Sequence, residues 1–180
     1  MNGGTIAATG AVSGVGNDWA LVGLGDLTGD GKADVVFRNL SSGVVAHWSW
    51  PGAANPLSDA PTTTFLSGVP LNWHVVGLGD FDSGGTTDLF WHNDNGANAV
   101  WLMGSNGQVQ QAAFFSGVGP DWQVVGTGDV NGDHKDDVIW RSDNGATAIW
   151  QMNGAGAPTV SFPGGVPSDW GTQTHHYDYV

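Results

Sequence analysis

Three segments of the chain place aspartates at alternate positions of a short, glycine-rich stretch. The first segment, loop one, reads Asp26-Leu-Thr28-Gly-Asp30-Gly31-Lys32-Ala-Asp34. A hard cation such as Ca²⁺ takes about six to eight oxygen ligands at about 2.3–2.6 Å, and alternate residues of a tight turn can supply them. In loop one, three carboxylates, the Thr28 hydroxyl and the Lys32 carbonyl would provide oxygens, and Gly31 would permit the sharp turn. Loop one therefore predicts a calcium site.

The other two segments keep this pattern with one departure each. Loop two reads Asp80-Phe-Asp82-Ser-Gly84-Gly85-Thr86-Thr-Asp88, and loop three reads Asp129-Val-Asn131-Gly-Asp133-His134-Lys135-Asp136-Asp137. Gly84 replaces a carboxylate, so we expect loop two to bind its cation most weakly or to use water there. His134 replaces a turn glycine, but histidine is among the better non-glycine residues at positive φ, so loop three should keep its site.

Taken singly, each loop could be a solvated Asp/Gly-rich turn, but three copies at repeat spacing favour calcium in at least one of them. The predicted calcium ligands are Asp26, Thr28, Asp30, Lys32 and Asp34 in loop one, Asp80, Asp82, Thr86 and Asp88 in loop two, and Asp129, Asn131, Asp133, Lys135 and Asp137 in loop three.

The loops belong to a longer repeat that begins with tryptophan. Trp19-Ala-Leu-Val-Gly-Leu-Gly-Asp26 returns as Trp73-His-Val-Val-Gly-Leu-Gly-Asp80 and as Trp122-Gln-Val-Val-Gly-Thr-Gly-Asp129. A period of about 50 residues, with several short strands in each unit, is typical of β-propellers and related arrays. We therefore predict one repeat domain over residues 1–180. Its full repeats are 19–72, 73–121 and 122–169, and its partial units are 1–18 and 170–180.

Each repeat reads as four antiparallel strands. The first strand leads into the aspartate loop, and the second follows it at 35–37, 89–91 and 138–140. Asn-Gly turns come next in the second and third repeats, and Asn-Gly between apolar runs is a strong hairpin signal. The third strand ends on Trp48, Trp101 or Trp150, and a fourth strand such as 109–115 completes the unit. The predicted fold class is therefore an all-β, propeller-type array of four-stranded antiparallel blades.

The composition agrees with this fold and argues against several functions. All 17 acidic residues are Asp, and Gly occurs 30 times, so the residues that stabilise long exposed helices are scarce. The net charge of −13 disfavours nucleic acid, whose binding depends on Lys and Arg contacts to phosphates. No run is long and apolar enough to predict membrane insertion. The absence of Cys excludes disulfides and thiolate metal sites.

The pattern Gly-Asp-(apolar)-(Asn/Asp/Thr)-Gly-Asp-Gly-x-x-Asp-(apolar)₂ resembles the FG-GAP, or VCBS-type, repeat of bacterial secreted proteins and integrin-α propellers. The resemblance covers nearly the whole chain and departs from the motif at Gly84 and His134. It implies a calcium-bound β-propeller with a role in adhesion, in carbohydrate binding or as an accessory module of extracellular enzymes. A low-affinity calcium loop is also most useful outside cells, so we expect a secreted protein. Met1-Asn2-Gly3 matches Met152-Asn153-Gly154, so the chain is expected to begin in mid-repeat, as a piece of a longer protein would.

Tryptophan, with 10 copies, is the other abundant residue type with a functional interpretation. Its fixed register favours packing between blades, but an exposed Trp could instead form a platform for the CH faces of a sugar. The second strand of each repeat ends on an aromatic residue followed by Arg or His. The predicted ligand-binding patch consists of Arg38, Trp91, His92, Trp140 and Arg141.

The sequence offers no constellation of catalytic residues. It contains no Gly-x-Ser-x-Gly elbow, zinc-binding helix motif or phosphate loop, and most of the Asp residues belong to the loops, so the chain is not expected to be an enzyme. The pair His175-His176 predicts a strand or a frayed end more than a metal chelate, because adjacent residues of a strand point to opposite faces.

These observations predict an extracellular, calcium-stabilised binding module, carbohydrate-binding or adhesive, whose partner is a carbohydrate or an extracellular protein. The alternative is a purely structural piece of a larger secreted protein that completes its ring by oligomerisation. Three full repeats are fewer than the about four to eight blades of closed propellers, and open strand edges invite pairing. A homodimer of six repeats would close the ring, and a monomer whose two ends pair is the other possibility.

Overall fold

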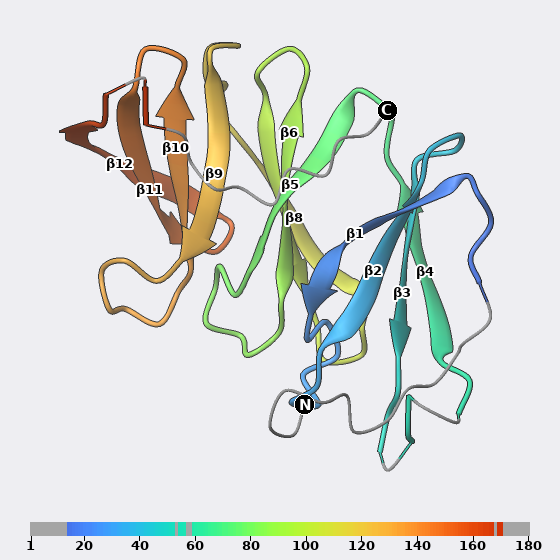
Figure 1. Ribbon diagram of the computed structural model, residues 1–180. Helices are drawn as coiled ribbons and strands as arrows, with labels where there is room; N and C mark the ends of the chain where they lie inside the picture. The colour runs from blue at the N-terminus through green and yellow to red at the C-terminus, as the bar shows by residue number, and fades with distance from the viewer. Residues whose placement is uncertain (1–13, 53, 57–58, 168, 171–180) are drawn as a thin grey trace, which may run out of the picture.

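The computed structural model describes residues 14–52, 54–56, 59–167 and 169–170, which form three antiparallel sheets of four strands each (Figure 1). Blade 1 contains β1 (Trp19–Gly25), β2 (Asp34–Asn39), β3 (Val44–Ser49) and β4 (Thr62–Gly68). Blade 2 contains β5 (Trp73–Gly79), β6 (Asp88–Asn93), β7 (Asn98–Met103) and β8 (Val109–Phe115). Blade 3 contains β9 (Trp122–Gly128), β10 (Asp137–Ser142), β11 (Ala146–Asn153) and β12 (Gly156–Gly165).

This arrangement confirms the predicted all-β class of four-stranded antiparallel blades. In each blade the strands pair in sequence order, as a meander. The turns between the second and third strands contain Gly43, Gly96 and Gly145 at positive φ (73°, 92° and 90°), which is why these turns use Gly after Ser or Asn. The predicted partial units at 1–18 and 170–180, with His175 and His176, lie outside the described residues except for 14–18 and Trp170.

The blades lie side by side, with the first strands of neighbouring blades next to each other. β1 lies beside β5, and β5 lies beside β9, so blade 2 is between the other two (Figure 1). Within the described residues no strand of blade 1 is hydrogen-bonded to a strand of blade 3. The three sheets therefore form an open arc, and closure of a ring is not seen.

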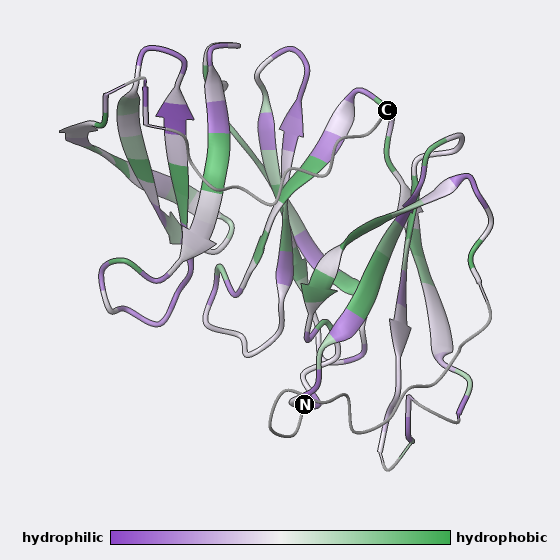
Figure 2. Ribbon diagram, in the orientation of Figure 1, coloured by the Kyte–Doolittle hydropathy of each residue, from purple (hydrophilic) through white to green (hydrophobic). Residues whose placement is uncertain are grey.

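The hydrophobic core lies between the blades. Successive residues of β6 point to opposite faces of the sheet, as the period of a strand requires. Leu89 and Trp91 pack in the cluster shared with blade 1, whereas Phe90 packs in the cluster shared with blade 3. Hydrophobic residues accordingly lie along the strands, and hydrophilic residues lie in many of the connecting loops (Figure 2). Each blade thus depends on its neighbour for the burial of one face.

Candidate metal centre

Each aspartate loop joins the first and second strands of its blade, so the three loops lie at the same end of neighbouring blades (Figure 1). The backbone has positive φ at the fourth and sixth positions of every loop, which are Gly29 and Gly31, Ser83 and Gly85, and Gly132 and His134. His134 has a φ of 66°, which confirms that histidine adopts the conformation of the glycine it replaces.

The first aspartate of each loop holds the turn together by accepting backbone N–H groups. Asp26 Oδ1 accepts the N–H of Gly29 and its Oδ2 that of Gly31, both at 2.7 Å. Asp80 and Asp129 accept hydrogen bonds from the same region of their own loops. These bonds, that from Gly132 first, hold the pKa of Asp129 below its ordinary value. The charged carboxylate is thus favoured at this position even without a cation.

The last aspartate of each loop is buried and ties the loop to the sheet. Asp34, Asp88 and Asp137 are at most 1% exposed. Asp88 accepts the N–H of Phe81 at 2.9 Å and that of Met103 at 2.8 Å, so it links loop two to the end of β7. Burial raises the pKa of all three carboxyls, and that of Asp88 to about 7.

Loop two brings three carboxylates together. One oxygen from each of Asp80, Asp82 and Asp88 lies within 4.8 Å of the others. Two oxygens bound to one Ca²⁺ at about 2.3–2.6 Å are at most about 5 Å apart, so this spacing fits a shared cation. The charges of Asp82 and Asp80 also help to raise the pKa of Asp88, after burial, and a bound cation would relieve this repulsion. The chemistry and spacing of this set fit calcium.

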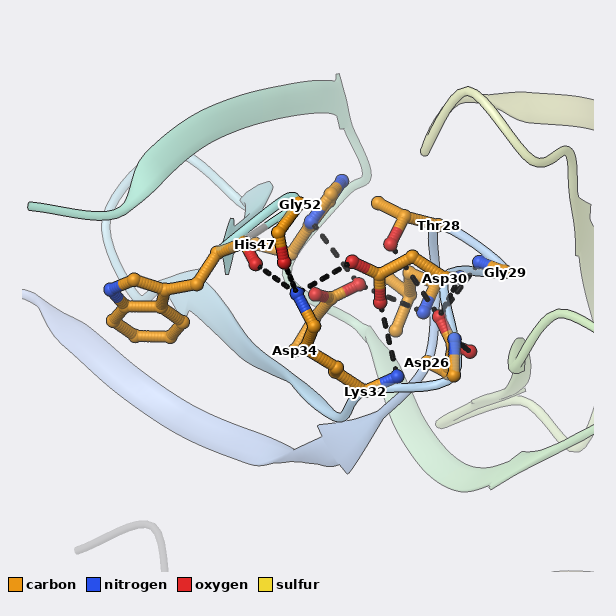
Figure 3. Close-up of polar contacts among 11 residues, drawn as sticks. Asp26, Thr28, Gly29, Asp30, Lys32, Asp34, His47 and Gly52 are labelled. Carbon is orange, nitrogen blue, oxygen red and sulfur yellow. Dashed lines mark hydrogen bonds and ion pairs between the residues drawn. The ribbon is translucent and has the colours of Figure 1, made fainter. Parts of the chain in front are cut away.

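In loops one and three a lysine ammonium approaches the central carboxylate instead. Lys32 Nζ lies 3.3 Å from Asp30 Oδ2 and donates to the carbonyl oxygens of Trp50 and Gly52 (Figure 3). Lys135 Nζ lies 3.6 Å from Asp133 Oδ2. Among the described residues, neither loop gathers three carboxylates as loop two does.

The sequence placed loop two last because of Gly84, and that ranking of binding strength stays a prediction, although it is loop two whose carboxylates the structure brings together. Loop two regains a carboxylate at its third position, where Asp82 stands in place of Thr28 and Asn131. Thr86 also replaces the lysine of the other loops, and its hydroxyl donates to the Met103 carbonyl at 2.8 Å. Loop two therefore has three assembled acidic ligands and no ammonium beside them.

Four of the five residues in the predicted ligand patch form contacts between blades, and this corrects the interpretation of the patch as an open platform. Trp91 and Trp140 are 1% and 0% exposed, so neither ring face is open to a sugar. The Arg38 guanidinium carbon lies 5.2 Å from the centroid of the Trp91 ring, and the His92 ring centroid lies 5.5 Å from that of Trp140. Arg141 is half-buried and donates to the Pro167 carbonyl at 2.9 Å. The repeated register of these residues reflects packing between neighbouring blades.

Besides Trp170, three Phe residues at another repeated position are exposed, and none of them belongs to the predicted patch. Phe65, Phe114 and Phe162 are 61%, 75% and 70% exposed and lie on the outermost strands β4, β8 and β12. Each ring meets the half-buried tryptophan that begins its own blade, with centroids 6.2, 5.9 and 6.2 Å apart. We call these three Phe residues the rim phenylalanines. Their signal in the sequence is a Phe three residues before Gly-Val at each repeat.

Comparison with known families agrees with the loop pattern. An FG-GAP-like repeat matches residues 80–140, and an FG-GAP repeat matches residues 122–160. FG-GAP and FG-GAP-like repeats are therefore present over residues 80–160, which include loops two and three. Repeats of this kind are typically non-catalytic binding modules. A search of curated proteins finds no match to the chain. Within the described residues, no helix has the length and apolar character needed to cross a membrane.

Proposed function

We propose that the chain is an extracellular, non-catalytic binding module, stabilised by calcium in loop two, that binds carbohydrate through the rim phenylalanines. The observation that carries this proposal is the exposure of Phe65, Phe114 and Phe162 at one equivalent position of all three blades. Leaving a Phe side chain in water forgoes about 1.5–3 kcal/mol of burial, so three such positions call for a function.

The chemistry around the rim phenylalanines suits a sugar. An aromatic ring offers an apolar face to sugar CH groups, and the tilted tryptophan behind it adds a second, half-buried ring with an N–H donor. Ser67 and Ser116, which follow Phe65 and Phe114 by two residues, are also exposed. Hydroxyl groups next to an apolar platform supply the polar contacts that orient a saccharide.

Repetition predicts multivalency. Three equivalent weak sites on one rigid arc would bind a polysaccharide or a clustered glycan more tightly than a single sugar, because the second contact is intramolecular.

Calcium would act at a distance from the ligand. Loop two joins β5 and β6, whereas the rim phenylalanines lie on the fourth strands, so the cation would hold the blade without touching the sugar.

A glycan array, followed by titration calorimetry with the best ligand, tests the proposal. The triple variant Phe65→Ser, Phe114→Ser, Phe162→Ser should lose binding while its melting temperature stays within a few degrees of the parent. The matched control is Leu40→Ser, which removes an exposed apolar side chain (44%) just after β2. Unchanged glycan binding by the triple variant, or the absence of any glycan ligand, would refute the carbohydrate proposal. Binding of an extracellular protein in its place would make the module adhesive.

A further inference from the structure

We propose that the outer face of blade 3 docks on the outer face of blade 1 of a second copy of this chain, so that two copies close a ring of six blades. The inference is independent of the proposed carbohydrate site. It follows from the two junctions within the chain, 1–2 and 2–3, which are built from the same contacts. The corresponding contacts at the two ends of the arc are unmatched.

The first repeated contact explains the Gly-x-Gly motif. A Cβ built on Gly25 would lie 2.8 Å from Thr87 Cβ, and one on Gly79 would lie 2.9 Å from Asp136 Cβ. The next blade therefore packs directly against these glycines, and a side chain at either position would force a shift. The equivalent glycine of blade 3 is Gly128, and nothing lies within 4 Å of its Cβ position. In blade 1, the residue equivalent to Thr87 and Asp136 is Ala33, which is exposed.

The inner glycines of the motif repeat this arrangement. A Cβ on Gly23 would lie 2.7 Å from Leu78 Cδ1 of the next blade. A Cβ on Gly77 would lie 2.8 Å from Thr127 Cγ2. Gly126 of blade 3 receives no side chain of another blade, because its one neighbour within 4 Å comes from β10 of its own sheet. The equivalent of Leu78 and Thr127 in blade 1 is Leu24, an apolar side chain that is 63% exposed.

A hydrogen bond between neighbouring aspartate loops is likewise repeated at both junctions. The Thr87 N–H donates to the Asp26 carbonyl at 2.6 Å, and the Asp136 N–H donates to the Asp80 carbonyl at 2.7 Å. The equivalent donor of blade 1 is the Ala33 N–H, and the equivalent acceptor of blade 3 is the Asp129 carbonyl. Within the described part of the chain neither group bonds to another blade.

The face of blade 3 at the end of the arc is less buried than the equivalent faces of blades 1 and 2. Val36 and His47 of blade 1 are fully buried by blade 2, and Phe90 and Val100 are fully buried by blade 3. Their equivalents in blade 3 are Ile139 and Ile149, which are only half-buried.

Stacking across the junctions leaves the arginine of blade 3 without a ring of another blade among the described residues. Arg38 lies over Trp91, and His92 lies against Trp140. Arg141 is the equivalent donor on the open face of blade 3. Phe37 is the equivalent ring of blade 1; it is 8% exposed and meets Trp48 at 4.8 Å, much as Trp91 meets Trp101 at 4.9 Å.

These complementary halves lie at opposite ends of the arc and are not joined within the described residues. A second copy can join them. Leu24 and Ala33 of each copy would pack on Gly126 and Gly128 of the other. The contact is head-to-tail and occurs twice, which gives a closed ring with two-fold symmetry. Six blades fall within the about four to eight of closed propellers.

Sedimentation equilibrium with calcium present tests the stoichiometry. We expect about twice the 18.6 kDa of one chain. Leu24→Ser should shift the mass to that of one chain with an unchanged circular dichroism spectrum, because Leu24 is exposed in the single chain. Phe114→Ser is the matched control, since it removes an apolar side chain that is also exposed (75%) but lies outside the junction, and it should leave the mass doubled. A parent mass of one chain at every concentration overturns the proposal.

Cross-linking tests the relative orientation of the two copies. The chain has no native Cys, so a disulfide can form only between the introduced cysteines. Chains with Ala33→Cys and chains with Gly128→Cys, mixed and oxidised, should form the mixed disulfide, because the equivalent Cβ atoms approach closely at both junctions seen. Each variant alone should remain uncross-linked. A disulfide between two Ala33→Cys chains, with none in the mixture, would mean that like faces meet and would overturn the head-to-tail arrangement.

Discussion

The backbone N–H of Thr87 donates to the carbonyl oxygen of Asp26 across the junction between blades 1 and 2, at 2.6 Å. Thr87 directly precedes Asp88, the buried carboxylate of loop two, and Asp26 is the first aspartate of loop one. Asp136 and Asp80 form the same pair at the next junction. The aspartate loops therefore belong to the contacts between blades, and a cation that orders a loop also orders a junction.

Calcium removal should lower the melting temperature, and Asp82→Ala should abolish most of that effect. Calcium at about 100 times its dissociation constant adds about 2.7 kcal/mol to the free energy of unfolding, which is roughly 5–10 °C for a chain of this size. Asp82 belongs to the assembled carboxylate cluster, whereas Asp133 lies 3.6 Å from the Lys135 ammonium. Differential scanning calorimetry with calcium and with EGTA measures the shift.

Asp133→Ala should therefore lose only part of the calcium shift, and Asp143→Ala, an exposed Asp outside the loops, should lose none. If Asp133→Ala loses the whole shift while Asp82→Ala keeps it, the cation is in loop three.

The stability of the calcium-free protein should fall as the pH rises from about 4 to about 7. Burial raises the pKa of Asp88 from 3.8 to about 7 in the folded state, so the folded state binds more protons than the unfolded state within this window. Stability then decreases with pH, by on the order of 4 kcal/mol if Asp88 acts alone.

Calcium should remove this loss, because the bound cation favours the ionised carboxylate. Urea unfolding in EGTA between pH 4 and pH 8 gives the profile, and Asp88→Asn, which cannot ionise, should flatten it. A stability that rises with pH in EGTA would contradict the raised pKa.

Much of the fold was predictable because each local sequence pattern occurs in all three repeats. Tryptophan, Gly-x-Gly-Asp and the Asn-Gly turns placed the first and second strands within one or two residues, and the predicted strand 109–115 coincides with β8. The buried side of each strand was not predictable in the same way. Alternation shows that Trp91 and Phe90 face opposite ways, but not that both faces are covered, since that depends on the neighbouring blades.

The candidate site shows the same limit. Ligand types and spacing located all three loops, but the ranking of the loops considered only the carboxylate at the fifth position. The sequence does not show that the Asp82 carboxylate lies close to two others, or that the Lys32 ammonium lies beside Asp30. The structure shows both. Exposure likewise separates Phe114, at 75%, from Trp91, at 1%, although both are aromatic residues at repeated positions.

A side chain at Gly25 should destabilise the fold, whereas the same change at Gly128 should not. A Cβ at Gly25 would lie 2.8 Å from Thr87 Cβ, and the equivalent space at Gly128 is open. Gly25→Val should cost about 1–3 kcal/mol through overpacking of the junction. Both changes should be made in the Leu24→Ser background, so that assembly does not contribute, and measured by urea unfolding. Equal losses for the two variants would show that the glycines serve strand conformation and not the approach of the next blade.

Arg38→Ala should be among the most destabilising single changes at the first junction. The Arg38 side chain is 6% exposed and lies over Trp91. Its guanidinium donates to the carbonyl oxygens of Val69 (3.2 Å), Pro70 (3.0 Å) and Trp73. Truncation would leave these acceptors short of a donor and open a gap beneath the indole, at a cost of about 2–4 kcal/mol.

Arg38→Lys should recover little of this loss, because an ammonium cannot match the planar fork of the guanidinium or stack on the ring. Arg141→Ala is the matched control. It removes the equivalent arginine from blade 3, where the guanidinium is half-buried and bonds to Pro167 alone among the described residues. Its cost in a single chain should stay below about 1 kcal/mol, by urea unfolding at a concentration where the protein is monomeric. A full recovery by Arg38→Lys would show that positive charge alone, and not the fork spanning two blades, holds the junction.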